Sequence, residues 1–534
     1  MCKRVFIGGA WPYANYKLHI GHLAALLPGD VIARYFRQKG AQVLYVSGSD
    51  CFGTPITETA RKEGAKPIDI ATRFHNEDVL DFQDLDFSYD NYGATFCDWH
   101  QREVQECFRI INGNGHLYRK QSSQPFCINE GRFLSGREIG GICAKCGSTA
   151  RGDQCDSCLA LLSTEDLKEK HCLICGMKIT MRPSHDLVFS LSTLQDRINK
   201  YFEENSSNWR ANAINETKKF IEQGLLDRDV TRNIEWGIDV PFDGYEGKKI
   251  YVWLEAVLGY MTSGRQAAIK LGMDFEDFLK NDDELRTYYV HGKDNIPFHT
   301  IILPALIMAL EKDIQLPKYI VSSEYVNMGT EKMSKSMGNL ITIRDLLSQY
   351  ESDTIRFYFM MNNPEKKDIS FDHASLLHVH NKVLVGGFGN FVNRNLLFLI
   401  KSFEGVIPKG KLNDNITKIT ENAYVSIGNS IETGNFRMAV DKMIEYIQTA
   451  NKYYDEQQPW LQVKNDMDSF ADTTATCLYI MANMSNLFAP ILTKGCLKLR
   501  KMLNLLDEAC WTPIDIADDL KLVDCSVLYN KIAT

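Results

Sequence analysis

Two histidines near the start of the chain stand in a pattern that suits phosphate chemistry. They occur in His19-Ile20-Gly21-His22, between an expected strand over 5–9 and an expected helix over 21–39. A helix N-terminus presents unpaired N–H groups and a positive dipole end, and imidazoles three residues apart share one helical face. The string predicts a phosphate site in which Gly21 leaves room for a nucleotide ring. An isolated string of this kind more often only caps or packs a helix.

A second string, much later in the chain, supplies cations. Lys332-Met333-Ser334-Lys335-Ser336 places two lysines three residues apart among small hydroxyl residues. Paired ammonium groups on a polar loop suit a pyrophosphate leaving group, whose negative charge grows in the transition state. Alone, such a string is more often a solvated surface loop. Together, the two strings predict a nucleotide site closed from two sides, in a protein that activates a carboxylate with ATP.

Four cysteines have the spacing of a structural zinc site. Cys143 and Cys146 form one C-x2-C pair, and Cys155 and Cys158 form another. Four thiolates close a tetrahedral Zn²⁺ site and leave no open position for catalysis. This stretch has few apolar residues, so zinc binding would contribute folding free energy. We expect one structural zinc per chain.

Composition places the chain among ordinary globular proteins. It has 534 residues, of which 44% are hydrophobic and 24% charged, and this length suggests roughly two to four domains. The formal net charge of −8 argues against a sequence-independent polyanion binder. No apolar run suits a secretion signal or a membrane span. We therefore expect a cytoplasmic protein without a membrane partner, whose 15 cysteines are thiols and metal ligands.

The elements that must position these groups begin in an α/β order. Strand 5–9, helix 21–39 and strand 43–47 form a βαβ unit, which requires a parallel sheet. Segments 249–254 and 288–292 are predicted as strands further along the chain.

The remaining stretches have a different character. Residues 115–229 are rich in cysteine and glycine, lack long periodic elements, and are predicted to be a domain inserted into the sheet. Beyond residue 376 apolar residues recur at three- and four-residue intervals, notably over 426–456 and 473–487. This spacing predicts a helical bundle.

Both strings resemble the signature motifs of class I aminoacyl-tRNA synthetases, and their surroundings resemble the methionyl-tRNA synthetase family. The resemblance runs from about residue 5 to the last residue and is carried by further segments. These are Ala10-Trp11-Pro12-Tyr13-Ala14-Asn15, Asp50 with Gly53-Thr54-Pro55, Tyr251-Val252-Trp253-Leu254-Glu255-Ala256 and Gly292-Lys293-Asp294-Asn295-Ile296-Pro297-Phe298-His299. The resemblance implies a Rossmann-like parallel-sheet catalytic domain with an inserted zinc-knuckle connective domain, followed by an all-α anticodon-binding bundle.

The resemblance also implies how the chain is divided. The parts are 1–114, the first half of the Rossmann catalytic domain; 115–229, the inserted zinc-binding connective domain; 230–325, the second catalytic half; 326–375, the loop of the second string and a stem-contact region; and 376–534, the helical anticodon-binding domain.

Individual residues receive roles from the same resemblance. The catalytic residues are His19, Gly21, His22, Lys332 and Lys335. The residues that bind ATP are His19, His22, Gly292, Asp294, Lys332, Ser334 and Lys335. The residues that bind methionine are Ala10, Trp11, Tyr13, Asp50, Trp253, Ala256, Tyr260, Asn295 and His299. The residues that read the anticodon are Asn390, Arg394 and Trp460.

The implied reaction has two steps. The methionine carboxylate attacks the α-phosphorus of ATP while the lysines stabilise the departing pyrophosphate, and the terminal ribose hydroxyl of the methionine tRNA then attacks the adenylate. Asp50 would pair with the α-ammonium group, and aromatic side chains would surround the thioether. Mg²⁺ would accompany ATP, held largely by phosphates. We expect a monomer, because no dimerising module follows the helical domain.

A second metal site stays open at this point. Some members of the family carry a second zinc, and here Cys127, Glu130, Cys172 and Cys175 could form its ligand set, with His171 as a substitute. A vacant or degraded site is an equal alternative.

The chain departs from the family pattern at two positions near the expected pocket. Phe52 stands where many relatives have histidine, and Val257 replaces a common proline. Both departures bear on side-chain selectivity and inhibitor sensitivity, and neither removes a catalytic string.

Alternatives within and outside the class remain. Synthetases for isoleucine, valine or leucine share both strings but insert a much larger editing domain, and a cysteinyl enzyme would place its zinc at the active site. A non-catalytic tRNA-binding paralogue is the alternative from a different class. The sequence alone leaves open the preference between initiator and elongator tRNA and the treatment of homocysteine.

Overall fold

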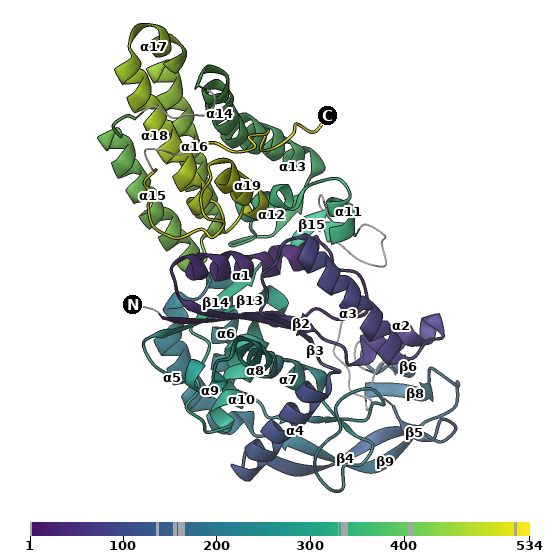
Figure 1. Ribbon diagram of the computed structural model, residues 1–534. Helices are drawn as coiled ribbons and strands as arrows, with labels where there is room; N and C mark the ends of the chain where they lie inside the picture. The colour runs from purple at the N-terminus through teal and green to yellow at the C-terminus, as the bar shows by residue number, and fades with distance from the viewer. Residues whose placement is uncertain are drawn as a thin grey trace.

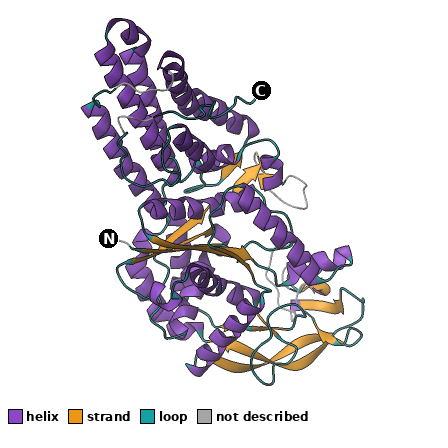
Figure 2. Cartoon of the chain, in the orientation of Figure 1, coloured by secondary structure: helices purple, strands orange, loops and turns teal. Residues whose placement is uncertain are grey.

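A parallel sheet of five strands with helices on both faces forms the centre of the described structure (Figures 1 and 2). The computed structural model describes residues 3–134, 138–152, 157, 166–328, 331–332, 340–403, 409–516 and 521–533. The sheet order is β14-β13-β1-β2-β3. The strands are β1 (Arg4–Gly9), β2 (Gln42–Ser49), β3 (Asn91–Ala94), β13 (Leu285–Gly292) and β14 (Tyr319–Ser323), and neighbours pair in parallel. With α1 (Ile20–Gln38) as the crossover helix, this confirms the predicted βαβ unit.

Alternating side chains along β1 face two different cores. Val5 and Ile7 pack into the core that contains the apolar face of α1, whereas Phe6 packs into the core that contains α8 (Gly259–Leu271). All three side chains are fully buried. This pattern is typical of a parallel strand whose sheet is covered by helices on both faces.

The order of the strands reverses at β1. The chain adds β2 and β3 on one side of β1 and later returns to add β13 and β14 on the other side. In open parallel sheets, ligands bind beyond the carboxyl ends of the strands at such a switch point. The ends of β1 and β13 therefore locate the candidate site.

The inserted region begins with two antiparallel sheets. The larger has the order β10-β9-β4-β5, and its strands are β4 (Leu117–Cys127), β5 (Arg132–Phe133), β9 (Thr180–Phe189) and β10 (Arg228–Asp229). The smaller has the order β7-β6-β8, and its strands are β6 (Ile139–Cys143), β7 (Thr149–Arg151) and β8 (Leu167–Cys172). A small separate core holds this end together and includes Cys127, Cys143 and Cys172. Among the described residues this core is far smaller than the two cores of the catalytic domain and the helical bundle.

Two sequence-based expectations in this part of the chain are wrong. The last third of 115–229 contains long helices, α5 (Gln195–Asn205) and α6 (Ala211–Gln223), which pack on the catalytic core through Ile198, Tyr201 and Ala213. The segment predicted as strand 249–254 is β12 (Lys249–Ile250) followed by the short helix α7 (Val252–Ala256). A short apolar run of this length fits a strand or a helix equally well, so periodicity alone did not separate the two.

Further helices complete the catalytic layers and the region after them. Around the sheet lie α2 (Thr54–Glu63), α3 (Pro67–Asp84), α4 (Asp98–Gly113), α9 (Phe275–Phe278), α10 (Leu303–Ala309) and the short turns η5 (Lys293–Asn295) and η6 (Phe298–Ile302). The next region contains β15 (Val326–Met328), β16 (Glu331–Lys332), β17 (Ile369–Phe371), α11 (Ile343–Leu347) and α12 (Ser352–Met361). β15 pairs with both β16 and β17, in the order β16-β15-β17.

The C-terminal part is helical, as predicted, and forms an elongated bundle beside the sheet on its α1 side (Figure 1). Its helices are α13 (His373–Val379), η8 (His380–Gly389), α14 (Asn390–Phe403), α15 (Asp414–Glu432), α16 (Phe436–Gln457), α17 (Pro459–Asn465), α18 (Met467–Leu487) and α19 (Thr493–Met502). The pattern over 426–456 is not one helix, because the chain turns at 433–435 with Gly434 at a φ of 71°. That left-handed conformation favours glycine.

One helix among the described residues, His373–Lys401, is long and apolar enough by composition to cross a membrane. Leu376, Leu384, Phe388 and Phe391 of this helix are buried in the core of the bundle. Packing within the protein accounts for its apolar composition.

Glu432 at the end of α15 joins the bundle to the sheet domain. Its carboxylate accepts hydrogen bonds from Tyr35 Oη at 2.6 Å and Lys39 Nζ at 2.7 Å and pairs with Arg286, while its backbone oxygen accepts one from Tyr288. Charged groups from the end of α1 and from β13 thus meet at a single carboxylate, which stabilises the docking of the bundle.

Candidate active site

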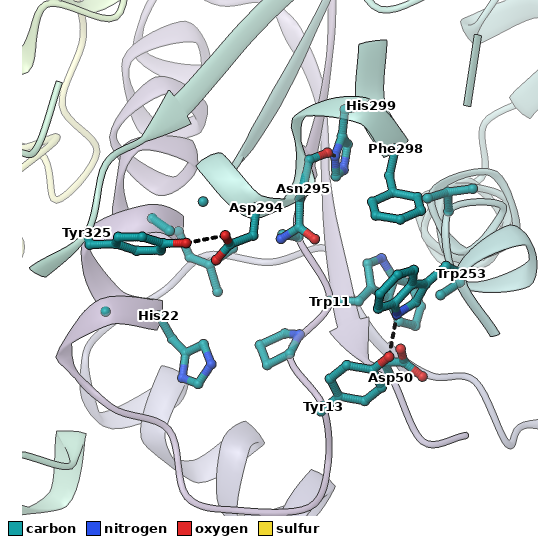
Figure 3. Close-up of a pocket in the computed structure, with 18 of the residues that line it drawn as sticks. Trp11, Tyr13, His22, Asp50, Trp253, Asp294, Asn295, Phe298, His299 and Tyr325 are labelled. Atoms are coloured by element: carbon teal, nitrogen blue, oxygen red, sulfur yellow. Dashed lines mark hydrogen bonds between the residues drawn. The ribbon is translucent and has the colours of Figure 1, made fainter. Parts of the chain in front are cut away.

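A cavity of about 390 Å³ opens beyond the carboxyl ends of β1 and β13, where the sheet topology locates a ligand (Figure 3). Every described residue expected to bind ATP or methionine lines it, apart from Lys332, whose side chain is not described. These are Ala10, Trp11, Tyr13, His19, His22, Asp50, Trp253, Ala256, Tyr260, Gly292, Asp294, Asn295 and His299, and Gly21 lines it too. Tyr325, Asp294 and His22 lie on one side of the cavity, and Trp253, Tyr13 and Asp50 lie on the other (Figure 3).

The two histidines of the first string cap the helix that they begin. His19 Nδ1 accepts a hydrogen bond from Gly21 N at 3.1 Å, and His22 Nδ1 accepts one from His19 N at 3.2 Å. Because Nδ1 is the acceptor in each neutral ring, the hydrogen resides on Nε2, which makes Nε2 a donor. The ring centroids are 3.9 Å apart. Capping and phosphate binding therefore use different ring atoms and are compatible.

The backbone ties the first string to residues 341–343. Ile20 N donates to Ile341 O at 3.2 Å, and Ile343 N donates to Leu18 O at 3.0 Å. Residues 341–343 follow the second string closely in sequence. Lys332 lies in β16, paired with Asn327 of β15, whereas Ser334 and Lys335 lie outside the described residues.

Asp50 is the carboxylate at the other end of the cavity. It is 2% exposed, and its Oδ1 accepts a hydrogen bond from Phe52 N at 3.2 Å. Burial raises the pKa of Asp50 well above its ordinary value. Backbone hydrogen bonds, Ala14 N to Asp50 O and Asp50 N to Pro12 O, tie this loop to the first pocket segment. A cation bound here would relieve the cost of a buried anion.

A second buried carboxyl, Glu255, is already matched by a histidine. Glu255 Oε2 lies 2.8 Å from His100 Nε2, and His100 Nδ1 lies 2.8 Å from Thr262 Oγ1. The Thr262 hydroxyl donates to Gly259 O, so Nδ1 carries a hydrogen and a single proton is shared between Nε2 and Glu255. The pair has no net charge whichever group holds that proton. Of these two buried carboxyls, Asp50 is therefore the one available to a cationic ligand.

Aromatic side chains enclose the space beside Asp50. Trp253 Nε1 donates to Tyr13 Oη, and the Trp253 and Phe298 rings meet edge to face with centroids 4.8 Å apart. Tyr260 Oη lies 2.7 Å from His299 Nε2, and His299 Nδ1 lies 2.8 Å from Asn295 O. Burial lowers the pKa of His299 to about 4, so at neutral pH it is an uncharged acceptor for Tyr260.

The Trp11 ring lies in a slot formed by glycines. A Cβ atom built on Gly48 would lie 2.3 Å from this ring, and one built on Gly259 would lie 2.6 Å from it. Any side chain at these positions would displace Trp11 from the cavity wall. The sequence identified Trp11 but gave no signal for the glycines that position it.

The nucleotide side of the cavity contains residues that sequence reasoning missed. Glu324, Tyr325 and Val326 line it from the connection between β14 and β15. The Tyr325 hydroxyl donates to the Asp294 carboxylate (Figure 3). None of these residues belongs to a recognised string, and only the parallel pairing of β13 with β14 brings them to the site.

The cysteines assemble in a way that the sequence did not establish. The Sγ atoms of Cys127, Cys172 and Cys175 lie within 4.8 Å of one another, and Cys127 and Cys175 are 3.4 Å apart. The backbone N–H of Glu130 donates to Cys127 Sγ. Among the described residues, neither the Glu130 carboxylate nor the His171 ring belongs to this cluster. The cluster could hold a metal ion.

The two C-x2-C-G turns in the described insertion share one backbone pattern. Cys143 N donates to Ser148 O and Gly147 N to Cys143 O, while Cys172 N donates to Met177 O and Gly176 N to Cys172 O. Gly147 and Gly176 both have positive φ, at 78° and 75°. Cys143 and Cys146 are described, but Cys155 and Cys158 lie outside the described residues, so the predicted four-cysteine set remains a prediction.

Two of the three residues expected to read an anticodon, Arg394 and Trp460, both contact Tyr454 in the helical bundle. Asn390 and Arg394 are on α14, and Trp460 is on α17. The Arg394 guanidinium lies 4.5 Å from the centroid of the Tyr454 ring, which lies 5.8 Å from that of Trp460. Arg394 also pairs with Asp455 at 2.7 Å. Trp460 is 37% exposed, so part of its surface is open to a stacking partner.

Comparison with known proteins agrees with this geometry. Residues 5–396 match the family described as tRNA synthetases class I (M), and residues 408–530 match the anticodon binding domain of methionyl tRNA ligase. Methionine–tRNA ligase 1 of Alkaliphilus oremlandii is 40% identical over 528 residues, covering 99% of this chain and 97% of its own. Methionine–tRNA ligase 1 of Bacillus cereus is 42% identical over 545 residues, covering 99% of both chains.

A solved structure has the same fold. The methionyl-tRNA synthetase of Mycobacterium tuberculosis in complex with methionyl-adenylate superposes with a TM-score of 0.81 at 21% identity, covering 98% of this chain and 99% of that one. The fold class predicted from the sequence is confirmed. The sheet, the cavity and the helical bundle agree with these matches. The chain belongs to the methionyl-tRNA synthetase family of class I aminoacyl-tRNA synthetases.

Proposed function

We propose that the protein attaches methionine to its tRNA through a methionyl-adenylate, releasing pyrophosphate and AMP. The observation that carries this proposal is the cavity at the switch point of the sheet, with the buried Asp50 at one end and His19 and His22 at the other. A carboxylate that matches an ammonium group and imidazoles that donate to phosphate lie on opposite sides of one space. An amino acid bound at Asp50 and ATP bound at the histidines would meet within this space.

The residues of the cavity have distinct roles in this scheme. Asp50 binds the α-ammonium group of methionine, and Tyr13, Trp253 and the neutral His299 surround its side chain. His19 and His22 donate through Nε2 to the phosphates, and Lys332 and Lys335 stabilise the departing pyrophosphate. The carboxylate of methionine is already a nucleophile, so positioning and charge stabilisation are sufficient for the first step. Mg²⁺ accompanies ATP and neutralises part of its charge.

ATP–pyrophosphate exchange with a panel of twenty amino acids tests the proposal. We expect exchange with methionine and with no other standard amino acid. Exchange with another amino acid would move the assignment within the class, and no exchange at all would favour a binding protein without catalysis.

The insertion is the proposed site of structural zinc. Cys143, Cys146, Cys155 and Cys158 are proposed to hold one zinc per chain, because thiolates at this spacing close a tetrahedral site. The assembled cluster of Cys127, Cys172 and Cys175 is a second place that fits a metal, with three thiols already close together. Bound zinc would stabilise the insertion and takes no part in the reaction steps.

Changing Cys146 to serine tests the four-cysteine site. We expect the variant to lose about one zinc per chain and to become more sensitive to protease within the insertion, since zinc contributes folding free energy there. Metal analysis of the purified protein measures the loss, and Cys510→Ser, at an exposed cysteine in the helical part, is the matched control. An unchanged zinc content would contradict the assignment. A further zinc lost in Cys172→Ser would establish that the second cluster is occupied.

The helical bundle is proposed to bind the anticodon of the methionine tRNA. Trp460 offers an aromatic face to a base, and Asn390 and Arg394 offer hydrogen-bonding edges, which is how single-stranded loops are recognised. The contacts of the Arg394 guanidinium and of the Trp460 ring with the same residue, Tyr454, support this role.

Changing Trp460 to alanine separates tRNA recognition from adenylation. Stacking on a base is worth about 1–3 kcal/mol, so we expect kcat/KM for tRNA charging to fall roughly ten- to a hundredfold. ATP–pyrophosphate exchange, which needs no tRNA, should be unchanged. Leu461→Ala is the matched control, since Leu461 is the neighbouring residue and is also exposed. Equal losses in both assays would remove the anticodon role.

We propose that the chain is divided into five parts. Residues 1–114 and 230–325 form the catalytic halves, 115–229 the insertion, 326–375 the stem-contact region and 376–534 the anticodon domain. The packing of α5 and α6 on the catalytic core suggests that the end of 115–229 belongs to that core. A cytoplasmic location and a monomeric state remain part of the proposal.

A further inference from the structure

Lys293 follows β13 directly and lies between residues of the cavity wall. Its neighbours Gly292, Asp294 and Asn295 all line the cavity. The Lys293 ammonium group instead forms ion pairs with Glu324 Oε2 and Asp368 Oδ1, each at 2.7 Å. It also lies 3.9 Å from the centroid of the Tyr325 ring. One cation thus meets two carboxylates and one aromatic face.

The partners of Lys293 come from segments that are distant in sequence. Glu324 and Tyr325 follow the end of β14, and Asp368 directly precedes β17. Glu324 Oε1 accepts a second hydrogen bond, from Asn212 Nδ2 of α6 at 2.9 Å. Asp368 Oδ1 also accepts a hydrogen bond from Tyr325 N at 3.0 Å. The network therefore joins the edge of the sheet, the connection between β14 and β15, and the strand that pairs with β15.

This connection carries the second string. Tyr325 precedes β15 (Val326–Met328), and β15 pairs with β16, which contains Lys332. Ile369 N donates to Tyr325 O at 2.9 Å, where β17 begins its parallel pairing with β15. The position of the β15–β16 hairpin thus depends on a residue, Tyr325, whose ring and backbone are both fixed by the Lys293 network.

Tyr325 also reaches into the nucleotide side of the cavity. Its hydroxyl donates to the Asp294 carboxylate, as the dashed line in Figure 3 marks. Glu324, the residue before Tyr325, lines the cavity as well. Without the lysine, Glu324 and Asp368 would be two close anions beside the place where a triphosphate must bind, and like charges in a partly buried setting repel strongly.

We propose that Lys293 is a positioning residue for ATP. It holds the base of the β15–β16 hairpin and the Tyr325–Asp294 contact in place, and it balances the negative charge of Glu324 and Asp368. The proposal rests on the adenylation reaction proposed above. Lys293 acts on the nucleotide half of the cavity, because its ammonium group contacts Glu324 and Tyr325, whereas Asp50 on the methionine side belongs to a different segment.

Lys293→Met tests this inference in methionine-dependent ATP–pyrophosphate exchange. We expect KM for ATP to rise about tenfold or more, and a tenfold change corresponds to ~1.4 kcal/mol. KM for methionine should stay within about twofold of its value in the unaltered protein. Lys293→Arg keeps the charge and both ion pairs and should recover most of the ATP affinity. Lys367→Met removes an exposed lysine beside Asp368 and is the matched control.

Binding of Mg²⁺–ATP to the free protein, measured by calorimetry, provides a readout that does not depend on turnover. We expect weaker ATP binding in Lys293→Met and unchanged methionine binding. Equal rises in both KM values, or no recovery in Lys293→Arg, would show a general structural role and overturn the inference. An unchanged KM for ATP in an active variant would overturn it as well. Absence of methionine-dependent exchange in the unaltered protein would instead contradict the proposed function.

Discussion

Asp50→Asn is expected to lower kcat/KM for methionine in ATP–pyrophosphate exchange by roughly 10²- to 10³-fold, the range for truncating one partner of a buried ion pair. The substitution keeps the size of the side chain and the hydrogen bond from Phe52 N, and it removes only the negative charge. Glu255 is the other buried carboxyl on the methionine side. Because it forms a pair with His100 that is neutral overall, it cannot replace the lost charge of Asp50.

The effect should be confined to methionine. KM for ATP should change little, since His22 and Asp294 lie on the other side of the cavity and the His19 ring lies 3.9 Å from that of His22. A rise in KM for ATP as large as that for methionine would contradict the assignment of Asp50 to the ammonium group. Thermal unfolding checks that the variant is folded.

The pH dependence of KM for methionine gives a second test of Asp50. Burial raises the pKa of Asp50 in the protein without ligand, so a larger fraction is protonated at a given pH than for an ordinary aspartate. A protonated carboxyl forms no ion pair with the ammonium group. KM for methionine should therefore fall as pH rises through that pKa, and this dependence should disappear in Asp50→Asn.

Asp30→Asn is expected to produce the largest loss of stability, about 3–5 kcal/mol in the free energy of unfolding. Asp30 and Arg356 are both fully buried, and their side chains are 2.6 Å apart. The guanidinium also donates to the backbone oxygens of Pro490 and Ile491. Asp30 is on α1, and Arg356 is on α12, so the substitution leaves a buried cation without its counter-ion at the junction of two parts of the chain.

Acid sensitivity supplies the matching prediction. Burial acts to raise the pKa of Asp30, but Arg34, Arg356 and hydrogen bonds from Ser88 outweigh it and hold that pKa well below its ordinary value. A lowered pKa stabilises the folded state above the unfolded value of about 3.9, and this stability is lost as pH falls through the folded pKa. Denaturant unfolding at neutral and acidic pH should show a smaller pH effect in Asp30→Asn than in the unaltered protein.

The outcome of the double substitution distinguishes charge from packing. Combining Asp30→Asn with Arg356→Met removes both charges and should recover part of the lost stability, since replacing a buried pair by apolar groups is often close to neutral. Arg344→Met, at a partly exposed pair with Asp81 and Asp84, is the control and should cost much less. Equal losses at the two positions would contradict the importance of burial.

Local patterns were sufficient where a helix or strand is determined by its own residues. The strand at 5–9 and the helix at 21–39 appear as β1 and α1, because a continuous apolar run and a 3.6-residue period identify them without reference to other segments. The failures occur where context decides. The run that contains Trp253 is apolar enough for a strand, yet it forms α7 beside the cavity, and the helical pattern over 426–456 is interrupted at Gly434, where the bundle turns against β14.

By itself the sequence determined which chemistry is present: histidines at a helix start, paired lysines, Asp50 and pairs of cysteines. Only the tertiary structure decided which groups act together. It joined Cys127 to Cys175 across 48 residues, matched Glu255 with His100, and brought Lys293, Glu324 and Asp368 to one point. The reason is physical, since such contacts depend on strand order and on the packing of distant segments, and neither leaves a periodic signal in the residues concerned.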